Sequence, residues 1–506
     1  MLDEYVRRIL CARVYDVAIE SPITEARQLS SRYQNRILLK REDLQEVYSF
    51  KIRGAYNKIA QLSPEQMARG VVTASAGNHA QGVALSATRL GIKATIVMPR
   101  TTPQIKVDGV RGRGGKVVLH GDTYDEASAH AVHLAETQGM AMIPAYDDVD
   151  VIAGQGTIGM EILRQWRGPL DAIFLPVGGG GLCAGVAAYV KYLRPEIRII
   201  AVEPEDAACL KAALAAGRRV TLPQVGLFAD GVAVAQIGKE PFRILRNIVD
   251  DVVTVTTDEI CAAIKHIFDD TRSISEPAGA LALAGLTKYI ETSGVTGETL
   301  LAVESGANTN FDRLRYIAER TEIGEQREAV LAVTIPEKPG SFKAFCTAIG
   351  RRNITEFNYR LGSPEAAHIF LGVQVSPGGE DREALVSHLQ ERGYDVLDLT
   401  DDEMAKLHIR HMVGGRAQAD HEVLYRFEFP ERPGALAHFL SRLGARWNIS
   451  LFHYRNHGAA YGRVLLGLQV PPKERAALRG LLTEIGYLFT EETGNPAYRL
   501  FLGRDA

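Results

Sequence analysis

The chain has 506 residues, 46% of them hydrophobic and 24% charged, which is the composition of a globular protein of roughly three domains. Its net charge of −3 and the lack of a basic stripe with interleaved aromatic residues argue against nucleic-acid binding, and no apolar run is long enough to span a membrane. The five cysteines lack metal-ligand spacing, so we expect no structural metal and no disulfide framework. With no signal peptide at the start, this predicts a cytoplasmic protein.

Through the first three hundred or so residues, short apolar β-rich runs are followed by a turn of small residues and then by a helical pattern. Examples begin at Gly70, Lys93 and Asp171. This alternation predicts an α/β fold with parallel sheets covered by helices on both faces. Ligands of such folds bind beyond the carboxyl ends of the strands, where the small-residue turns lie.

The first unusual stretch is "VYSFKIRGAYNKI", residues 47–59, where Lys51 lies in an aromatic and aliphatic seam next to Phe50. Most lysines are solvated surface residues. A lysine in a desolvated pocket, however, loses its proton easily and becomes a nucleophile that forms Schiff bases. This stretch by itself leaves both interpretations open.

The next turn, "ASAGNHAQG", places Ser75, Ala76, Gly77 and Asn78 between a predicted strand and a predicted helix. Its backbone N–H groups suit a carboxylate, and the Asn78 amide can donate to a phenolate-like oxygen. The alternative is that Ser75 and Asn78 only cap the helix. We assign His79 no catalytic role.

A glycine-rich loop follows the apolar strand "AIFLPV" and opens a helix. It consists of Gly178, Gly179, Gly180, Gly181 and Leu182. Uncovered N–H groups at a helix N-terminus form an anion cradle, which predicts phosphate binding. The stretch from Gly178 to Ala184 also fits the dinucleotide pattern GxGxxA, with Glu203 placed to bind a ribose. That alternative predicts an NAD(P)-dependent oxidoreductase.

The last of these turns is "VESGANTNF", where Ser305 follows the predicted strand "TLLAV" and Gly306 allows close approach of another backbone. Alone, this turn identifies no function.

After a charged boundary segment at 315–330, the sequence repeats. An F-x-Y-R string ends at Arg360 and again at Arg455, the "LGVQV" from Leu371 returns as "LGLQV" from Leu466, and a Pro-Gly pair at 339–340 returns at 433–434. Each copy is predicted to run strand, turn, helix, strand, strand. We interpret the pair as a duplication.

Taken together, the sequence resembles the fold-type II pyridoxal-phosphate enzymes of the tryptophan synthase β family and, among them, the biosynthetic threonine dehydratases. The strings that carry the resemblance are "KREDLQEVYSFKIRGAYNKI", "SAGNHAQGVA", "PVGGGGL", "ESGANTNF" and the C-terminal duplication. The resemblance implies a catalytic region at 1–320 with a small domain at about 40–150 inserted in a large one. A linker at 321–328 and two ACT-like regulatory subdomains, at 329–401 and 422–494, then follow.

The same resemblance implies roles for single residues. Lys51 would carry the cofactor, pyridoxal 5'-phosphate, as a Schiff base and act as the base at Cα. The loop from Gly178 to Leu182 would hold the cofactor phosphate, Asn78 would contact the ring hydroxyl, and Ser305 would face the pyridine nitrogen. Ser75, Ala76 and Gly77 would contact the amino-acid substrate.

The resemblance further implies β-elimination of L-threonine to 2-oxobutanoate and ammonia, feedback inhibition by isoleucine and valine, and a homotetramer. Phe342, Tyr359 and Tyr454 are expected in the effector sites; their alternative is the core of the repeats. Ala76 stands where serine racemases have a second acid-base serine, and Cys209 stands where their metal site has an aspartate, so we expect neither racemisation nor a metal. The remaining alternatives are an L-serine dehydratase or racemase, the oxidoreductase above, and a cofactor-free amino-acid sensor.

Overall fold

The computed structural model divides the chain into two compact units, Met1–Gly324 (unit 1) and Glu325–Ala506 (unit 2). The division falls within 321–328, where helix α14 (Arg313–Gly324) ends and strand β11 (Glu328–Pro336) begins. The limits of the individual domains stay a prediction. The structure describes residues 2–311, 313–362, 365–402, 405, 409–411, 417–430, 435–443, 446–455, 461–495, 498 and 502.

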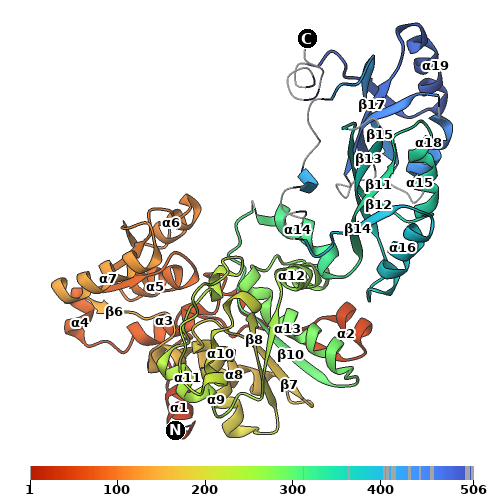
Figure 1. The fold of residues 1–506 in the computed structure, drawn as a ribbon. Coiled ribbons are helices and arrows are strands. Elements are labelled where there is room, and N and C mark those ends of the chain that lie inside the picture. The colour runs from red at the N-terminus through yellow and green to blue at the C-terminus, as the bar shows by residue number, and fades with distance from the viewer. Residues whose placement is uncertain are drawn as a thin grey trace. The chain divides into compact units, whose positions relative to one another are not determined.

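The larger sheet of unit 1 has the strand order β1-β2-β10-β7-β8-β9 and is parallel except for the β1–β2 pair (Figure 1). Its strands are β1 (Ile23–Glu25), β2 (Arg36–Arg41), β7 (Ala172–Pro176), β8 (Arg198–Pro204), β9 (Asp251–Val255) and β10 (Thr299–Glu304). The helices associated with this part are α1 (Leu2–Leu10), α2 (Arg27–Tyr33), α8 (Val149–Gln165), α9 (Gly181–Leu193), α10 (Cys209–Ala216), α11 (Lys239–Leu245), α12 (Thr257–Thr271) and α13 (Pro277–Ser293).

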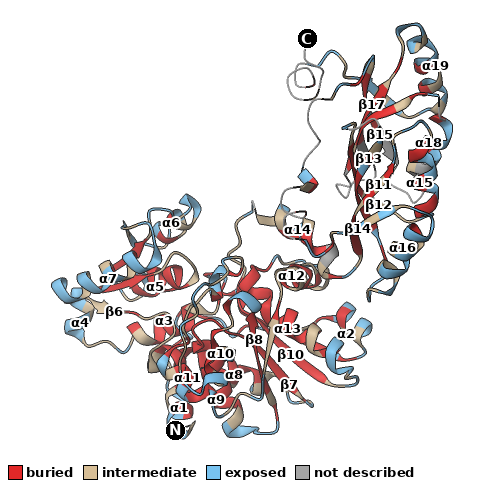
Figure 2. Cartoon of the chain, viewed as in Figure 1, coloured by how far each residue is buried: buried red, intermediate tan, exposed pale blue. Residues whose placement is uncertain are grey.

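Alternation along β7 shows why both faces of this sheet are covered. Ile173 and Leu175 join one apolar core with α8 to α11, whereas Ala172 and Phe174 join a second core with α2, α12 and α13. Successive side chains of a strand point to opposite faces, so a strand that is apolar throughout needs helices on both sides. The inner strands β7 and β10 are buried along their whole length (Figure 2). The predicted α/β class with helix-covered parallel sheets is confirmed.

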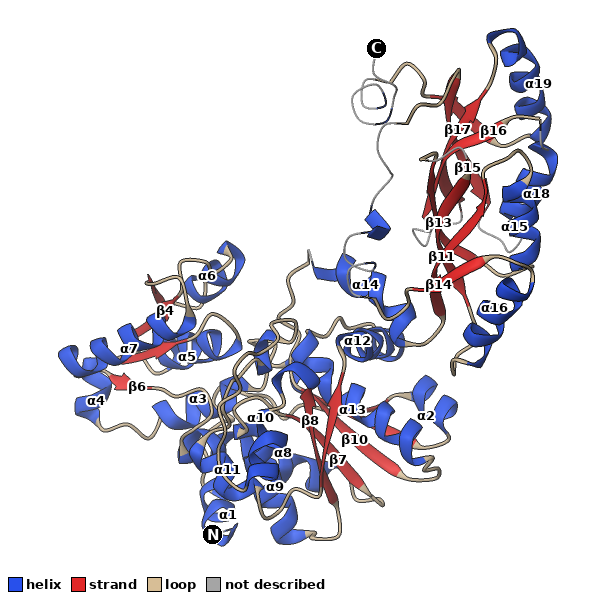
Figure 3. Cartoon of the chain, viewed as in Figure 1, coloured by secondary structure: helices blue, strands red, loops and turns tan. Residues whose placement is uncertain are grey.

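The smaller sheet of unit 1 has the order β5-β4-β3-β6 and is parallel (Figure 3). Its strands are β3 (Val71–Ala74), β4 (Ala94–Met98), β5 (Lys116–Leu119) and β6 (Ala141–Met142). The helices in this part of the chain are α3 (Lys51–Ile59), α4 (Pro64–Arg69), α5 (Asn78–Arg89), α6 (Gln104–Arg111) and α7 (Tyr124–Gln138).

Unit 2 has one antiparallel sheet in the order β14-β11-β13-β12-β16-β17-β15-β18. Each strand of one half has its counterpart in the other at the same distance from the β12–β16 pair, which fits two copies of one unit joined edge to edge. Its other strands are β12 (Ile354–Arg360), β13 (Ala366–Gln374), β14 (Asp395–Asp398), β15 (Glu422–Pro430), β16 (Asn448–Arg455), β17 (Tyr461–Gln469) and β18 (Leu488–Glu491). The helices α15 (Ser341–Ile349), α16 (Glu380–Glu391), α18 (Ala435–Leu443) and α19 (Arg475–Ile485) line one face (Figure 3).

The predicted order strand, helix, strand, strand is present in both copies, and each copy adds a further helix and edge strand. The first Pro-Gly turn, at 339–340, precedes α15 as predicted, whereas the second, at 433–434, lies outside the described residues. In the part of the chain that the structure describes, no helix combines the length and the apolar character needed to cross a bilayer.

Candidate active site

Lys51 is the first residue of α3, and the loop before it is tied to the loop after β10. The Phe50 N–H donates to the Ser305 carbonyl at 3.2 Å, and the Ala307 N–H donates to the Tyr48 carbonyl at 2.9 Å. Tyr48 has φ +54°, a left-handed conformation that residues other than glycine seldom adopt. The resulting turn lets the chain pair with the second loop and enter the helix at once, so Lys51 and Ser305 are brought together.

The surroundings of the Lys51 amine favour its neutral form. Nζ lies 3.3 Å from the Ala145 carbonyl oxygen and 5.1 Å from the centre of the Phe50 ring. Burial lowers the pKa of Lys51 to about 8, and the nearby carboxyl of Glu276 opposes this shift only in part. About one tenth of the amine is then unprotonated at pH 7, against a few parts in ten thousand for an ordinary lysine. The desolvated interpretation of the seam is the one the structure supports.

Asn78 is the first residue of α5, and its side chain is part of a hydrogen-bond network of two amides and a carboxylate. Its Nδ2 donates to Glu276 Oε1 at 2.5 Å, and its Oδ1 accepts from Asn308 Nδ2 at 2.7 Å. Asn308 also donates to the Val47 carbonyl at 2.7 Å. Both ends of the Asn78 amide are therefore held, and its orientation is set by residues from three separate parts of the chain.

Glu276 is a residue of this site that the sequence analysis missed. It is buried immediately before α13, and burial raises its pKa to about 7, although the Asn78 hydrogen bond lowers it. A Cβ on Gly306 would lie 2.6 Å from Glu276 Oε1 and 3.1 Å from Ser49 Cβ, so the carboxyl fills the space that this glycine leaves. In the sequence, a glutamate before Pro277 at a helix start is ordinary, since acids and prolines favour helix N-termini.

Ser305 follows β10 and is buried at 3% exposure. Its Oγ donates to the Ala278 carbonyl at 3.1 Å, and its N–H donates to the Gly279 carbonyl at 3.3 Å. The first turn of α13 therefore holds the residue in place. A hydroxyl at this position is neutral and exchanges hydrogen bonds as donor or acceptor.

The glycine-rich loop at the carboxyl end of β7 has no room for side chains. A Cβ on Gly178 would lie 2.8 Å from Val232 Cα, and one on Gly179 would lie 2.1 Å from Cγ of Tyr146. Gly180 has φ +90° and Gly181 begins α9. Among the described residues, the N–H groups of Gly179 and Gly180 have no protein acceptor. Unpaired amides beside a helix N-terminus suit an anion, and phosphate binding by this loop stays a prediction.

The remaining predicted residues are Leu182 and the three residues before Asn78. Leu182 is buried in the core under α9. Ser75, Ala76 and Gly77 join β3 to α5 and are partly buried, and the Gly77 N–H donates to Ser75 Oγ at 3.3 Å. The methyl group of Ala76 offers no acid or base. The loop of Ser75, Ala76 and Gly77 ends at Asn78, whose side chain is bonded to Glu276.

The position of Glu203 argues against a dinucleotide. Its carboxylate accepts the N–H groups of Leu210 at 2.7 Å and Lys211 at 2.9 Å, at the start of α10. Both oxygens are thus used by the protein and are not presented to a ribose.

Cys209 Sγ donates to the Gly178 carbonyl at 3.4 Å. His79, also buried, has Nε2 2.9 Å from the Ile143 carbonyl, and burial together with Lys51 lowers its pKa to about 3, as suits a structural histidine.

In unit 2, the predicted effector residues lie in the apolar core beneath the helices. Tyr359 is 3% exposed, its ring meets Phe342 edge-on at 4.8 Å between ring centres, and its hydroxyl donates to the Glu337 carboxylate. Tyr454 is also buried and is opposite Phe357 in the β12–β16 ladder. The structure therefore joins Phe342 with Tyr359, and an effector role for these residues stays a prediction.

Two family models match the chain. Residues 14–306 match the model described as "Pyridoxal-phosphate dependent enzyme", and residues 319–409 and 413–502 each match the "C-terminal regulatory domain of Threonine dehydratase". The two regulatory matches correspond to the two halves of unit 2.

Curated relatives are similar over the whole chain. The "L-threonine dehydratase biosynthetic IlvA" of Burkholderia multivorans is 57% identical over 99% of both chains, and that of Escherichia coli is 56% identical over 99% of this chain and 97% of its own. Among solved structures, processed threonine deaminase isoform 2 from Solanum lycopersicum has 51% identity and a TM-score of 0.62, covering 63% of this chain and 93% of its own. Maize serine racemase has 32% identity and a TM-score of 0.58, covering 62% of this chain and 95% of its own.

Proposed function

Because the chain belongs to the biosynthetic threonine dehydratases, a family of pyridoxal-phosphate-dependent enzymes, we propose that it converts L-threonine to 2-oxobutanoate and ammonia, the first step of isoleucine biosynthesis. The observation that carries this proposal is the Lys51 amine, whose pKa is lowered to about 8 and whose loop is bonded to the Ser305 loop. The oxidoreductase alternative is not favoured, since Glu203 is occupied by α10.

The residues present fit pyridoxal 5'-phosphate. The loop from Gly178 to Leu182 offers N–H groups at a helix N-terminus that are unpaired within the described part of the chain, which suits a phosphate. Lys51 would hold the aldehyde carbon, Asn78 would face the ring hydroxyl, and Ser305 would face the ring nitrogen. When bound, the cofactor supplies an electron-withdrawing ring that stabilises negative charge at the substrate Cα.

The chain's own residues would carry the proton transfers and the orientation of substrate. When free of the cofactor, the Lys51 amine would take the Cα proton, because its lowered pKa keeps part of the amine neutral near pH 7 to 8. The Cβ–O bond then breaks, the hydroxyl leaves as water with one added proton, and a Cα–Cβ double bond forms. The released 2-aminocrotonate hydrolyses to 2-oxobutanoate and ammonia. The loop of Ser75, Ala76 and Gly77 would hold the substrate carboxylate through the N–H groups of Ala76 and Asn78, which have no acceptor among the described residues.

Ala76 sets the choice between elimination and racemisation. Racemisation needs a second acid-base group on the face of the substrate opposite Lys51, and we place Ala76 at that face. A methyl group cannot deliver a proton, so reprotonation from that side depends on water. This supports a dehydratase over a serine racemase.

Regulation belongs to unit 2. We propose that isoleucine and valine bind there near Phe342, Tyr359 and Tyr454, and that the working enzyme is a cytoplasmic homotetramer. An aromatic ring with a polar tip suits an amino acid with an aliphatic side chain. Effectors act by binding one conformation better than another, with a coupling of about 1–3 kcal/mol.

The test uses purified protein incubated with pyridoxal phosphate. We expect a near-visible absorption band, a link to Lys51 that borohydride makes permanent and peptide mapping locates, and 2-oxobutanoate formed from L-threonine. Lys51→Ala should lose the link and the activity. Tight binding of NAD or NADP with no such band would instead support the oxidoreductase, and isoleucine binding with neither band nor turnover would support the sensor.

A further inference from the structure

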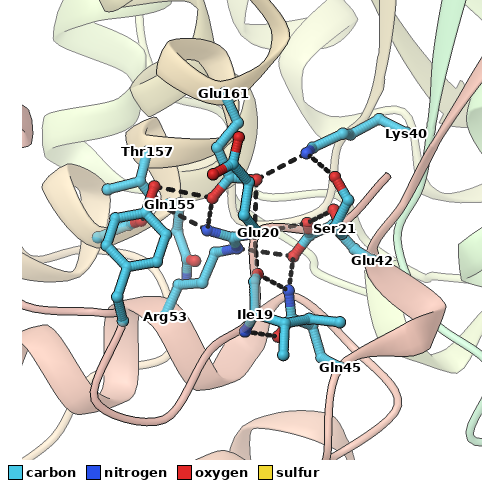
Figure 4. A network of polar contacts seen from close by, with 12 residues as sticks. Ile19, Glu20, Ser21, Lys40, Glu42, Gln45, Arg53, Gln155, Thr157 and Glu161 are labelled. Atoms are coloured by element: carbon cyan, nitrogen blue, oxygen red, sulfur yellow. Dashed lines mark hydrogen bonds and ion pairs between the residues drawn. The ribbon is translucent and has the colours of Figure 1, made fainter. Parts of the chain in front are cut away.

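Four charged side chains without any exposed surface lie together under the start of α3 (Figure 4). This Arg53 cluster consists of Lys40, Glu42, Arg53 and Glu161. Two cations and two carboxylates balance each other. Glu42 lies in the short 3₁₀ turn after β2, Glu161 on α8, and Arg53 on α3. The cluster therefore joins the helix that begins with Lys51 to the framework of the larger sheet.

Arg53 uses its whole guanidinium group in the cluster. Nε and Nη2 donate to the two oxygens of Glu42 at 2.7 and 2.8 Å. Nη1 and Nη2 donate to the two oxygens of Glu161 at 2.6 and 3.0 Å. Further bonds reach Thr157 Oγ1 and the Ile19 carbonyl, both at 3.1 Å. A planar fork held by two carboxylates in this way has one position and one orientation.

Lys40 completes the cluster on the far side of the carboxylates. Its Nζ donates to Glu161 Oε2 at 2.6 Å and to the Ser21 carbonyl at 2.5 Å. Glu161 is thereby fixed by Lys40 on the sheet strand β2 as well as by Arg53. Movement of Arg53 would break charge pairs that water cannot reach, and uncompensated buried charges are costly.

The backbone of α3 near Arg53 is also closely packed against two neighbouring helices. A Cβ on Gly154 would lie 2.7 Å from the Arg53 carbonyl oxygen and from Gly54 Cα, so α3 and α8 touch backbone to backbone. On another side, a Cβ on Gly82 of α5 would lie 3.2 Å from the Lys51 carbonyl carbon. Lys51 is two residues before Arg53 in the first turn of α3. The position of its amine therefore depends on how firmly this turn is held.

We propose that Arg53 is a positioning residue, which fixes the first turn of α3 against Glu42 and Glu161 and so aims the Lys51 amine. Buried ion pairs are often no more stabilising than apolar residues of the same shape, so stability alone does not require this cluster. What the fork supplies is a single orientation. The inference deepens the proposed function and rests on it, because it assigns Lys51 the cofactor and the Cα proton.

The test is Arg53→Lys, which keeps the charge but loses the planar fork. Relative to wild type, we expect kcat for L-threonine to fall roughly 10- to 100-fold, as for a misplaced catalytic group. We expect KM to change by no more than about threefold. We also expect the apoprotein to capture pyridoxal phosphate more slowly by a factor similar to the fall in kcat. That rate reports the placement of Lys51 without any turnover.

The matched control is Arg410→Lys in unit 2. Arg410 is 5% exposed and bridges Glu356 and Glu328, with Nε 2.9 Å and Nη2 3.4 Å from their oxygens. This variant removes a fork that is nearly as buried, so its thermal midpoint should fall while kcat and the capture rate stay within about twofold of wild type. Both variants are measured well below their own midpoints.

Wild-type kcat and capture rate in folded Arg53→Lys would overturn the proposal, as would equal losses in the control. If Arg53→Lys does not fold, Glu42→Gln decides, since it keeps the shape of the cluster and removes one charge. It should show the same two losses to a smaller degree, and wild-type values there would also overturn the proposal. Failure of the proposed function can be told apart from failure of this inference, because wild type itself would then neither capture the cofactor nor turn over threonine.

Discussion

Replacing Glu276 by glutamine should change how stability depends on pH. Burial raises the pKa of this carboxyl from an ordinary 4.5 to about 7 in the folded protein. Between these values the folded protein keeps the proton and the unfolded chain has lost it, so the free energy of unfolding falls as pH rises. At pH 8 the carboxylate is charged in both states, and the cost of burying it is fully present. It amounts to about 3 kcal/mol.

The variant Glu276→Gln has no charge to bury, and its Oε1 can still accept the Asn78 hydrogen bond. The difference in unfolding free energy, variant minus wild type, should therefore rise by up to about 3 kcal/mol between pH 5 and pH 8. Urea unfolding of the two apoproteins at both pH values, at one protein concentration, measures this. Glu203, with its pKa raised to about 7, is present in both proteins and cancels. A difference that stays constant within about 0.5 kcal/mol would refute an ionising carboxyl buried beside Asn78.

Five further outcomes are expected. The rate at which the apoprotein captures a neutral aldehyde should rise about tenfold from pH 7 to pH 9, whereas an amine with an ordinary pKa would give about a hundredfold rise. Ala76→Ser should gain some Cα racemisation of L-serine, and substantial D-serine from wild type would contradict the single-base argument. Gly179→Ala should weaken pyridoxal phosphate binding at least tenfold in equilibrium titration, because its Cβ meets the Tyr146 ring; unchanged affinity would remove the cradle. A chain ending at Gly324 should retain dehydratase activity and lose isoleucine inhibition; inhibition that survives truncation would place the effector site in unit 1. Tyr359→Ala should weaken isoleucine inhibition with little change in turnover measured without isoleucine.

Much of this protein is readable from its sequence, because the determining patterns are local. Apolar runs such as β7 followed by glycines and a helix specify a strand, a turn and an anion cradle within about 20 residues. Lys51 with its apolar neighbours, and each of the strings repeated in unit 2, also lie within a few consecutive residues. These features sufficed for the α/β class and the duplication, whereas the cofactor and the regulatory role of the repeat came from the resemblance of the strings to a known family.

Contacts between side chains that are far apart in the sequence were decided only by the tertiary structure. Glu276 meets Asn78 across 198 positions, and Arg53 meets Glu161 across 108. Their sequence neighbours give no hint, since Glu276 has the pattern of a helix start and Arg53 that of an exposed helix cation. Strand order and the close crossing of α3 with α8 bring them together. Low solvent access then turns ordinary charged residues into an acid with a raised pKa and a rigid support for the reactive lysine, because the effect of a charge depends on the water removed from around it.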